Sequence, residues 1–122
     1  MRSKTFQDVE VWKLAHQFVL RIYKLTEKLP KQEMFGLTSQ LRRAAVSVPA
    51  NIAEGYKKRT PADKAKFYNI SQGSLEECRY YLILIHDLDY AETSDLQDEL
   101  DRVARVLDAY MKSMLESFAV SR

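Results

Sequence analysis

The 122-residue sequence has few of the residues that interrupt regular secondary structure, with only three glycines and three prolines. A barrel or sandwich of many short strands needs a turn former at each connection, so this scarcity excludes those folds and favours long helices. The chain also has a single cysteine, Cys78, which cannot form a disulfide within the chain. We therefore expect an all-α protein without internal disulfide bonds.

Long hydrophobic runs are absent as well. No stretch approaches the roughly 18 consecutive apolar residues of a membrane-spanning helix, and residues 1–7 lack the apolar core of a secretory signal. The sequence predicts a soluble, cytoplasmic protein with no membrane association. Its 46% of hydrophobic and 30% of charged residues are typical of a folded chain. The length fits one domain over residues 1–122.

Apolar residues recur at alternating steps of three and four in four segments, which predicts four amphipathic helices. The inward residues predicted for the first two are Val11, Ala15, Phe18, Ile22, Leu25 and Leu29, then Leu37, Leu41, Ala44, Ala45, Val48, Ile52 and Tyr56. Those of the last two are Phe67, Ser71, Ser74, Cys78, Tyr81, Ile85 and Leu88, then Leu96, Leu100, Val103, Leu107, Tyr110, Met114 and Phe118.

Capping and breaking residues predict where these helices begin and end. The first helix begins after Asp8 as N-cap and ends before Pro30, and the second begins after Gly36 and ends at residue 56 or 57. The third begins at Thr60-Pro61 and ends near residue 90. Ser94, with Gln97 three residues later, matches a capping box that opens the fourth.

Short connections force consecutive helices to lie antiparallel, which predicts an up-down-up-down four-helix bundle. Pro49 lies inside the second helix, where it removes a backbone donor and clashes with the preceding turn. We therefore expect a kink in the second helix at Pro49.

Residues that could carry chemistry are scarce. The two histidines, His16 and His86, have no second histidine, cysteine or carboxylate at metal-ligand spacing. Cys78 lies on the predicted inward face of the third helix, where a cysteine acts as a small buried hydrophobe rather than a nucleophile. We expect no metal, no cofactor and no enzymatic activity.

The second helix carries a distinctive arrangement of residues outside its core stripe. One strip is polar, and a second is built of Arg42, Val46, Pro49 and Ala53. We interpret these strips as an interface between copies of the chain, in which small residues let a second helix approach. The candidate interface residues are Arg42, Arg43, Val46, Pro49, Asn51, Ala53 and Glu54. The alternative is a solvated face with an incidental run of small residues.

At this stretch the sequence resembles the bacterial four-helix-bundle proteins first noticed as products of intervening sequences within 23S ribosomal RNA genes. The matching elements are Phe6 with Val11-Trp12, then Leu41-Arg42-Arg43-Ala44 through Pro49-Ala50-Asn51-Ile52-Ala53-Glu54-Gly55, and Gly73-Ser74-Leu75-Glu76-Glu77. The resemblance implies a four-helix bundle assembled as a ring of five. A related architecture, the accessory variability protein of diversity-generating retroelements, binds nucleic acid and a reverse transcriptase. The family has no settled biochemical activity.

Charge is unevenly distributed along the chain. Residues 57–66 contain five basic residues and one acid, a local charge of +4, whereas residues 86–101 contain seven acids and no lysine or arginine. In an up-down-up-down bundle these segments lie at opposite ends. The basic end also receives Arg2, Lys4 and Arg122. A cyclic assembly would align all the basic ends on one face.

Two functions are consistent with these features. The first is a homo-oligomeric adaptor, a pentamer by resemblance, that binds RNA or DNA through phosphate contacts. Its candidate nucleic-acid-binding residues are Lys57, Lys58, Arg59, Lys64 and Lys66. The second is a structural or protein-protein interaction module with no nucleic-acid role.

Overall fold

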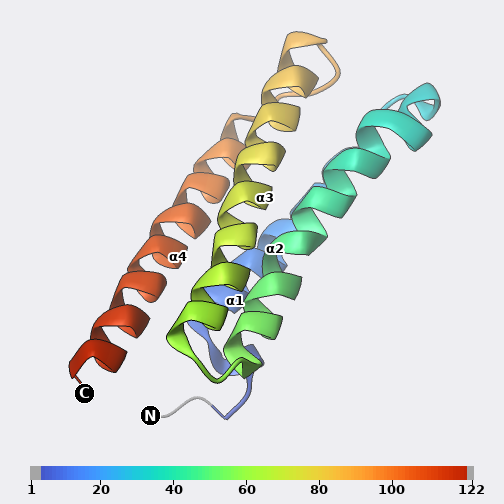
Figure 1. Ribbon diagram of the computed structural model, residues 1–122. Coiled ribbons are helices and arrows are strands. Elements are labelled where there is room, and N and C mark those ends of the chain that lie inside the picture. Colours follow the sequence, from blue (N-terminus) through green and yellow to red (C-terminus); the bar gives the residue numbers. More distant parts are fainter. Residues whose placement is uncertain (1–3, 121–122) are drawn as a thin grey trace.

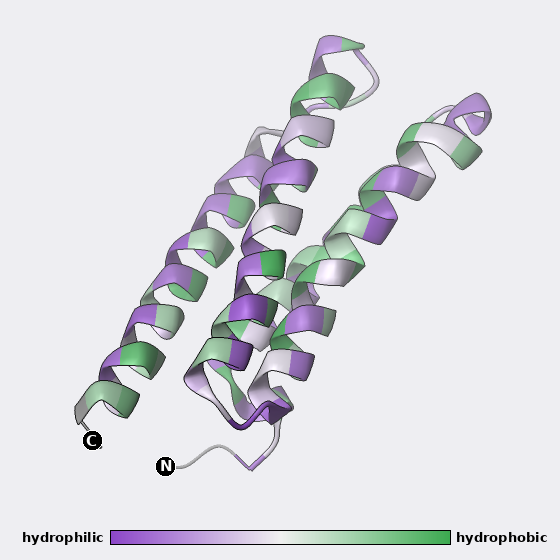
Figure 2. Cartoon of the chain, in the orientation of Figure 1, coloured by the Kyte–Doolittle hydropathy of each residue, from purple (hydrophilic) through white to green (hydrophobic). Residues whose placement is uncertain are grey.

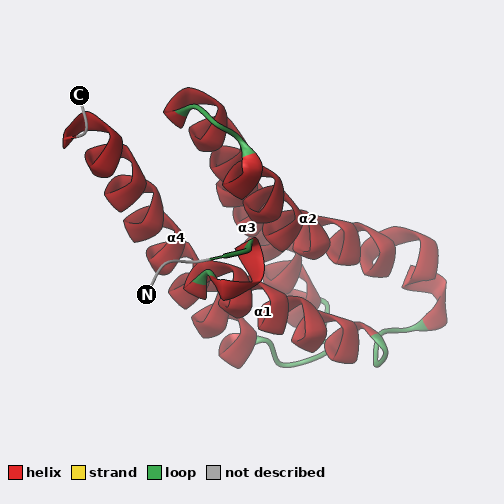
Figure 3. Ribbon diagram, turned by 90° about the horizontal axis from the view of Figure 1, so that it is seen from below, coloured by secondary structure: helices red, strands yellow, loops and turns green. Residues whose placement is uncertain are grey.

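The computed structural model describes residues 4–120, and in this range all regular structure is helical (Figure 1; helices are red in Figure 3). The long helices are α1 (Glu10–Thr26), α2 (Ser39–Lys57), α3 (Pro61–Asp87) and α4 (Ser94–Val120). Short 3-10 turns lie at Phe6–Asp8 (η1) and Lys31–Glu33 (η2), and a π-helical turn lies at Met34–Thr38 (η3). None of the helices in the described range is long and apolar enough to cross a membrane. Arg2 and Arg122, predicted at the basic end, lie outside the described residues.

The four helices run up, down, up and down, as the short connections predict (Figure 1). Helix α1 packs against α2 and α4, and α3 packs against the same two helices. Figure 2 shows hydrophobic and hydrophilic residues side by side around each helix, the amphipathic pattern expected of a bundle. The predicted inward residues Phe18, Ile22, Leu41, Leu100 and Leu107 are fully buried.

The register predicted for the third helix is wrong by one position at several turns. The buried residues of α3 are Tyr68, Ser71, Leu75, Cys78, Leu82 and Ile85. Of the predicted inward residues, Leu88 is 46% exposed, and Ser74 and Tyr81 are half-buried because they face α2 rather than the core. The Ser74 hydroxyl donates to Oγ of Ser47 at 2.8 Å.

Helix starts follow the predicted capping chemistry in one case. The Thr60 hydroxyl accepts a hydrogen bond from the Asp63 amide at 3.1 Å, with Pro61 as first helical residue. In α4, however, Ser94 is the first helical residue, and the side-chain Nε2 of Gln97 instead donates to Oγ1 of Thr93 at 2.9 Å.

The ends of the first and third helices also differ from the prediction. Asp8 belongs to η1, where its carboxylate accepts hydrogen bonds from the Lys4 and Thr5 amides, and α1 begins at Glu10. Helix α1 ends at Thr26 rather than before Pro30, and α3 ends at Asp87, two residues before Asp89 adopts a positive φ of 59°. Side-chain periodicity continues past the end of α1 because the following turn still buries Leu29, whereas Leu88 after α3 is exposed.

Helix α2 is continuous through Pro49, which is buried. Helical hydrogen bonding is maintained on both sides of this residue, so the structure adds no support for a distinct kink there. Within η3, Gly36 has φ −112° and ψ −108°, a conformation outside the helical region, and the helical path is kinked at this residue.

Helices α2 and α3 make the most extensive contact between helices of the bundle. A Cβ atom added to Gly55 would lie 2.5 Å from Cε1 and 2.8 Å from Cδ1 of Tyr68, so only glycine fits there. Seven residues earlier on α2 the contact is polar, since the Ser71 hydroxyl donates to the Val48 carbonyl at 2.8 Å. Small and hydroxyl side chains therefore let these two helices approach closely.

We expect Gly55→Ala to lower the free energy of unfolding by about 1–3 kcal/mol, because the added methyl overlaps a fully buried ring. The matched control is Gly73→Ala, where a Cβ has nothing within 4 Å and alanine favours the helix. Urea unfolding of both variants provides the measurement. Equal midpoints for the two variants would contradict the proposed α2–α3 contact.

Candidate nucleic-acid interface

The structure assembles no constellation typical of a catalytic centre from the residues that it describes. No group of three or more metal-ligating side chains occurs within residues 4–120. His16 stacks on Trp12 at 5.0 Å, and His86 lies beside Asp87 and Glu92, whose carboxylates raise its pKa. Burial raises the pKa of the Cys78 thiol to about 12, so it stays protonated near pH 7 and is a poor nucleophile.

The predicted basic residues gather where α2 connects to α3. Lys57, Lys58, Arg59 and Lys66 are exposed, and none of them forms an ion pair with a residue in the described range. The ammonium of Lys58 lies 4.9 Å from the centre of the Phe67 ring. Four cations are therefore presented to solvent at this end, which we call the basic end.

Lys64, the fifth candidate, has a structural role. Its amine donates to the carbonyl oxygens of Tyr56 at 2.7 Å and of Gly55 at 3.3 Å in the last turn of α2, and the Gly55 carbonyl also accepts from the Lys58 amide. A cation is favoured at this position by the helix dipole. Burial lowers the pKa of this amine. Lys64 thus ties α3 to the end of α2, and its charge is largely directed inward.

The opposite end of the bundle is less acidic than its sequence suggests. Lys24 at the end of α1 and Lys28 just after it line one pocket together with Glu92 and Asp95. Further along α4, the carboxylate of Glu99 accepts from Arg21 at 3.1 Å, and Asp101 pairs with Arg79. The charge of residues 86–101 alone does not include these cations, because they come from other segments of the chain. The sequence predicted an acidic end, and the structure places acidic and basic side chains together there. We call it the mixed end.

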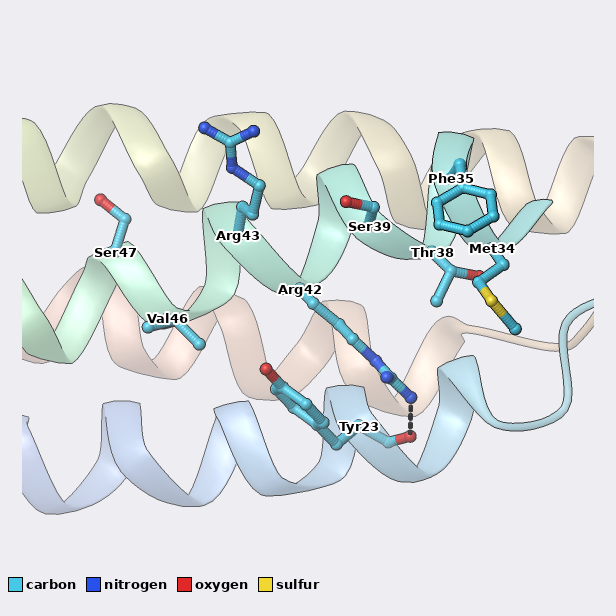
Figure 4. Close-up of a pocket in the computed structure, with 9 residues that line it drawn as sticks. All are labelled: Tyr23, Met34, Phe35, Thr38, Ser39, Arg42, Arg43, Val46 and Ser47. Atoms are coloured by element: carbon cyan, nitrogen blue, oxygen red, sulfur yellow. Dashed lines mark hydrogen bonds between the residues drawn. The ribbon is translucent and has the colours of Figure 1, made fainter.

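An open groove lies between α1 and α2 at this mixed end (Figure 4). It has a volume of about 610 Å³, and it is lined by Tyr23, Met34, Phe35, Thr38, Ser39, Arg42, Arg43, Val46 and Ser47. Met34 is 52% exposed and Phe35 is 92% exposed, unusually high values for large apolar side chains. We call this feature the α1–α2 groove.

The two arginines of the groove differ in their contacts. Arg42 points toward α1, where it donates to Oγ1 of Thr26 at 2.7 Å and to the Tyr23 carbonyl at 3.4 Å, and its guanidinium lies 4.4 Å from the Tyr23 ring centre (Figure 4). Arg43 points to the other side of α2 and is exposed. Arg42 therefore fixes α1 to α2, and Arg43 offers an uncompensated charge at the surface.

The other candidate interface residues are spread over different surroundings. Val46 is 40% exposed in the groove. Pro49 is buried, and the Asn51 amide donates to the Ser47 carbonyl and hydroxyl within the same helix. Ala53 and Glu54 line a second pocket near the start of the chain. The structure thus brings together only Arg42, Arg43 and Val46 of the seven candidates in one groove.

Sequence reasoning missed two exposed apolar residues, Met34 and Phe35. They lie in the π turn between the predicted helices, where periodicity gives no information about burial. The available signal was Met-Phe-Gly in a connection, since large apolar residues in a loop are uncommon unless they are packed or serve an interface.

The model of the 23S rRNA-intervening sequence protein family matches residues 7–109. This chain belongs to that family. The match covers α1, α2 and α3 entirely and extends into α4, and it includes all the motif residues noted above except Phe6, which lies one residue before it. No curated protein matches the chain.

A solved structure also resembles the fold of this family member. It is a protein of unknown function from the S23 ribosomal protein family of Bacteroides thetaiotaomicron, with a TM-score of 0.78 and 24% identity. The alignment covers 84% of this chain and 98% of that one. At this identity the likeness shows the shared four-helix fold and leaves the activity to be inferred from the surface of the present chain.

We expect Lys64→Met to lower the free energy of unfolding by about 1 kcal/mol, because two carbonyl groups lose a charged donor in a partly exposed setting. Lys66→Met, which removes an exposed cation from the same helix, is the control and should change stability by less than about 0.5 kcal/mol. Chemical denaturation of both variants measures the difference. Equal losses would refute the structural role of Lys64.

Proposed function

We propose that this protein is a non-enzymatic, homo-oligomeric accessory factor that binds nucleic acid through its basic end. The observation that carries this proposal is the set of four exposed cations, Lys57, Lys58, Arg59 and Lys66, free of ion pairs with residues 4–120. Exposed, uncompensated lysine and arginine side chains neutralise phosphates and release their condensed counterions. Such contacts give binding without sequence preference.

Two exposed apolar surfaces support self-association. One is the α1–α2 groove with Phe35, Met34 and Val46, and the other is an outward strip of α3 with Ile70, Tyr80 and Ile83, each 41–59% exposed. Large exposed apolar residues on a small protein mark interaction surfaces. Their charges are complementary, because the exposed Arg43 borders the groove whereas Glu77 and Asp87 are exposed on α3.

Different surfaces that complement each other give a head-to-tail contact, which generates a ring when the rotation closes. We therefore place the α3 strip of one copy against the α1–α2 groove of the next. The number of five copies follows from the family resemblance alone. In such a ring all basic ends share one face, so their phosphate contacts add together.

The assembly predicts that the wild-type protein has a solution mass well above that of the 14.2 kDa chain. Phe35→Ser should lower this mass, because it removes the most exposed apolar side chain of the groove. Leu115→Ser is the matched control, since Leu115 is 44% exposed on α4 away from both surfaces. Light scattering measures all three, and a monomeric wild type would refute self-association.

Binding to nucleic acid should depend steeply on salt. Each phosphate contact with a single strand contributes about 0.7 to the slope of log affinity against log salt concentration. Replacement of Lys57, Lys58 and Arg59 by glutamate removes three such contacts and should therefore flatten this slope by about 2 for each copy in contact. Reversal of Lys24, Lys28 and Lys31 is the control, because it makes the same change in net charge at the mixed end. Anisotropy of labelled strands measures both.

The second candidate function, a structural or protein-protein interaction module, is favoured by the same exposed apolar surfaces. If the wild-type protein assembles but binds no RNA or DNA at low salt, this module is the better description. Equal binding by the basic-end variant and the wild type would likewise refute the role of the basic end.

A further inference from the structure

A pocket of about 490 Å³ lies beside the basic end, between the segment that precedes α1 and the last turns of α2. Phe6, Ala53 and Tyr56 form its apolar walls, and Lys4, Lys57 and Glu54 place charges around them. Lys57 also belongs to the exposed cations of the basic end. The pocket and the proposed phosphate contacts are therefore continuous.

The wall that contains Phe6 is held in place by local hydrogen bonds. The Thr5 hydroxyl accepts from the Gln7 amide at 3.2 Å, and the Asp8 carboxylate accepts from the Lys4 and Thr5 amides at 3.0 and 3.3 Å. The Phe6 ring also packs edge-on against Trp12, with 5.1 Å between ring centres. This aromatic surface is thus built before any ligand arrives, which lowers the entropic cost of binding.

The charged groups of the pocket match a nucleotide unit. Glu54 is exposed and makes no hydrogen bond or ion pair with any residue between 4 and 120, so its carboxylate is available to accept hydrogen bonds. Carboxylates accept from the exocyclic amino groups of bases. Lysines beside an aromatic wall are the arrangement with which proteins hold single strands, through phosphate contacts and base stacking.

We propose that this pocket takes one unstacked base of a single-stranded nucleic acid. The base lies against Phe6, its edge faces Glu54, and the neighbouring phosphates lie beside Lys4 and Lys57. This inference rests on the proposed function, because it names the form of nucleic acid that the basic end prefers. Bases within a duplex are stacked and paired, so the protein binds single strands of RNA or DNA more tightly than duplexes of equal length.

An abasic strand separates base binding from phosphate binding, because it keeps the phosphates and lacks the bases. We expect the wild-type protein to bind a labelled oligoadenylate of about 12 nucleotides about tenfold more tightly than an abasic strand of equal length. RNA and DNA versions should behave alike. Since Trp12 is the single tryptophan and lies against Phe6, its fluorescence should change with the base-containing strand only.

Two variants test the pocket itself. Phe6→Leu removes the stacking surface and keeps an apolar wall, and Ala53→Leu fills the pocket while leaving Phe6 in place. Each should bring the affinity for oligoadenylate close to that for the abasic strand, with the salt slope unchanged. Unfolding midpoints equal to that of the wild type confirm that both variants are folded.

The outcomes distinguish this inference from the function on which it rests. Equal affinity of the wild type for both strands, with a steep salt slope, overturns the base pocket and leaves phosphate binding intact. Absence of binding to every strand overturns both. A change of solution mass in Ala53→Leu shows that the pocket is occupied by a second copy of the chain, which also overturns the base pocket.

Discussion

The close contact between α2 and α3 is the constraint on which the remaining structure depends. Because the Tyr68 ring occupies the space where a side chain at position 55 would lie, the two helices can approach to a distance that ordinary residues would prevent. The polar contacts of Ser47, Ser71 and Val48 extend this closeness along the helix pair. The same contact fixes the position of the short connection Lys58–Thr60. It thereby also fixes the positions of the exposed cations.

The sequence predicted the number and order of the helices better than the register of each helix. The four helices and their antiparallel order follow from apolar spacing and from the few connecting residues, and the structure confirms both. The register of α3 could not be predicted, because Ser74 and Leu75 are each compatible with an inward stripe. Its register is decided by what α2 presents, a hydroxyl at Ser47 and a gap at Gly55.

The candidate sites show a second limit of sequence reasoning. The sequence gives the type of a basic residue but not what its side chain contacts. Lys64 and Lys66 are two residues apart, yet one amine is bonded to the carbonyl groups of α2 and the other is in solvent. Arg42 and Arg43 divide in the same way. Only the positions of neighbouring helices separate a cation that stabilises the fold from one that is available to a partner. Family membership, with a shared fold at 24% identity, does not make this distinction either.

The order of the helices along the chain also has a consequence for how the molecule folds. Contacts between α1 and α2, α2 and α3, and α3 and α4 join helices that are neighbours in sequence, whereas the contacts of α1 with α4 and of η1 with α2 bring distant segments together. The loss of entropy on closing a loop grows with its length, so the hairpin of α2 and α3, with three residues in its connection, has the smallest loop-closure cost. Chains dominated by such local contacts fold within microseconds to milliseconds. The most restrictive packing in the protein, at Gly55 and Tyr68, is therefore also among the contacts that can form earliest.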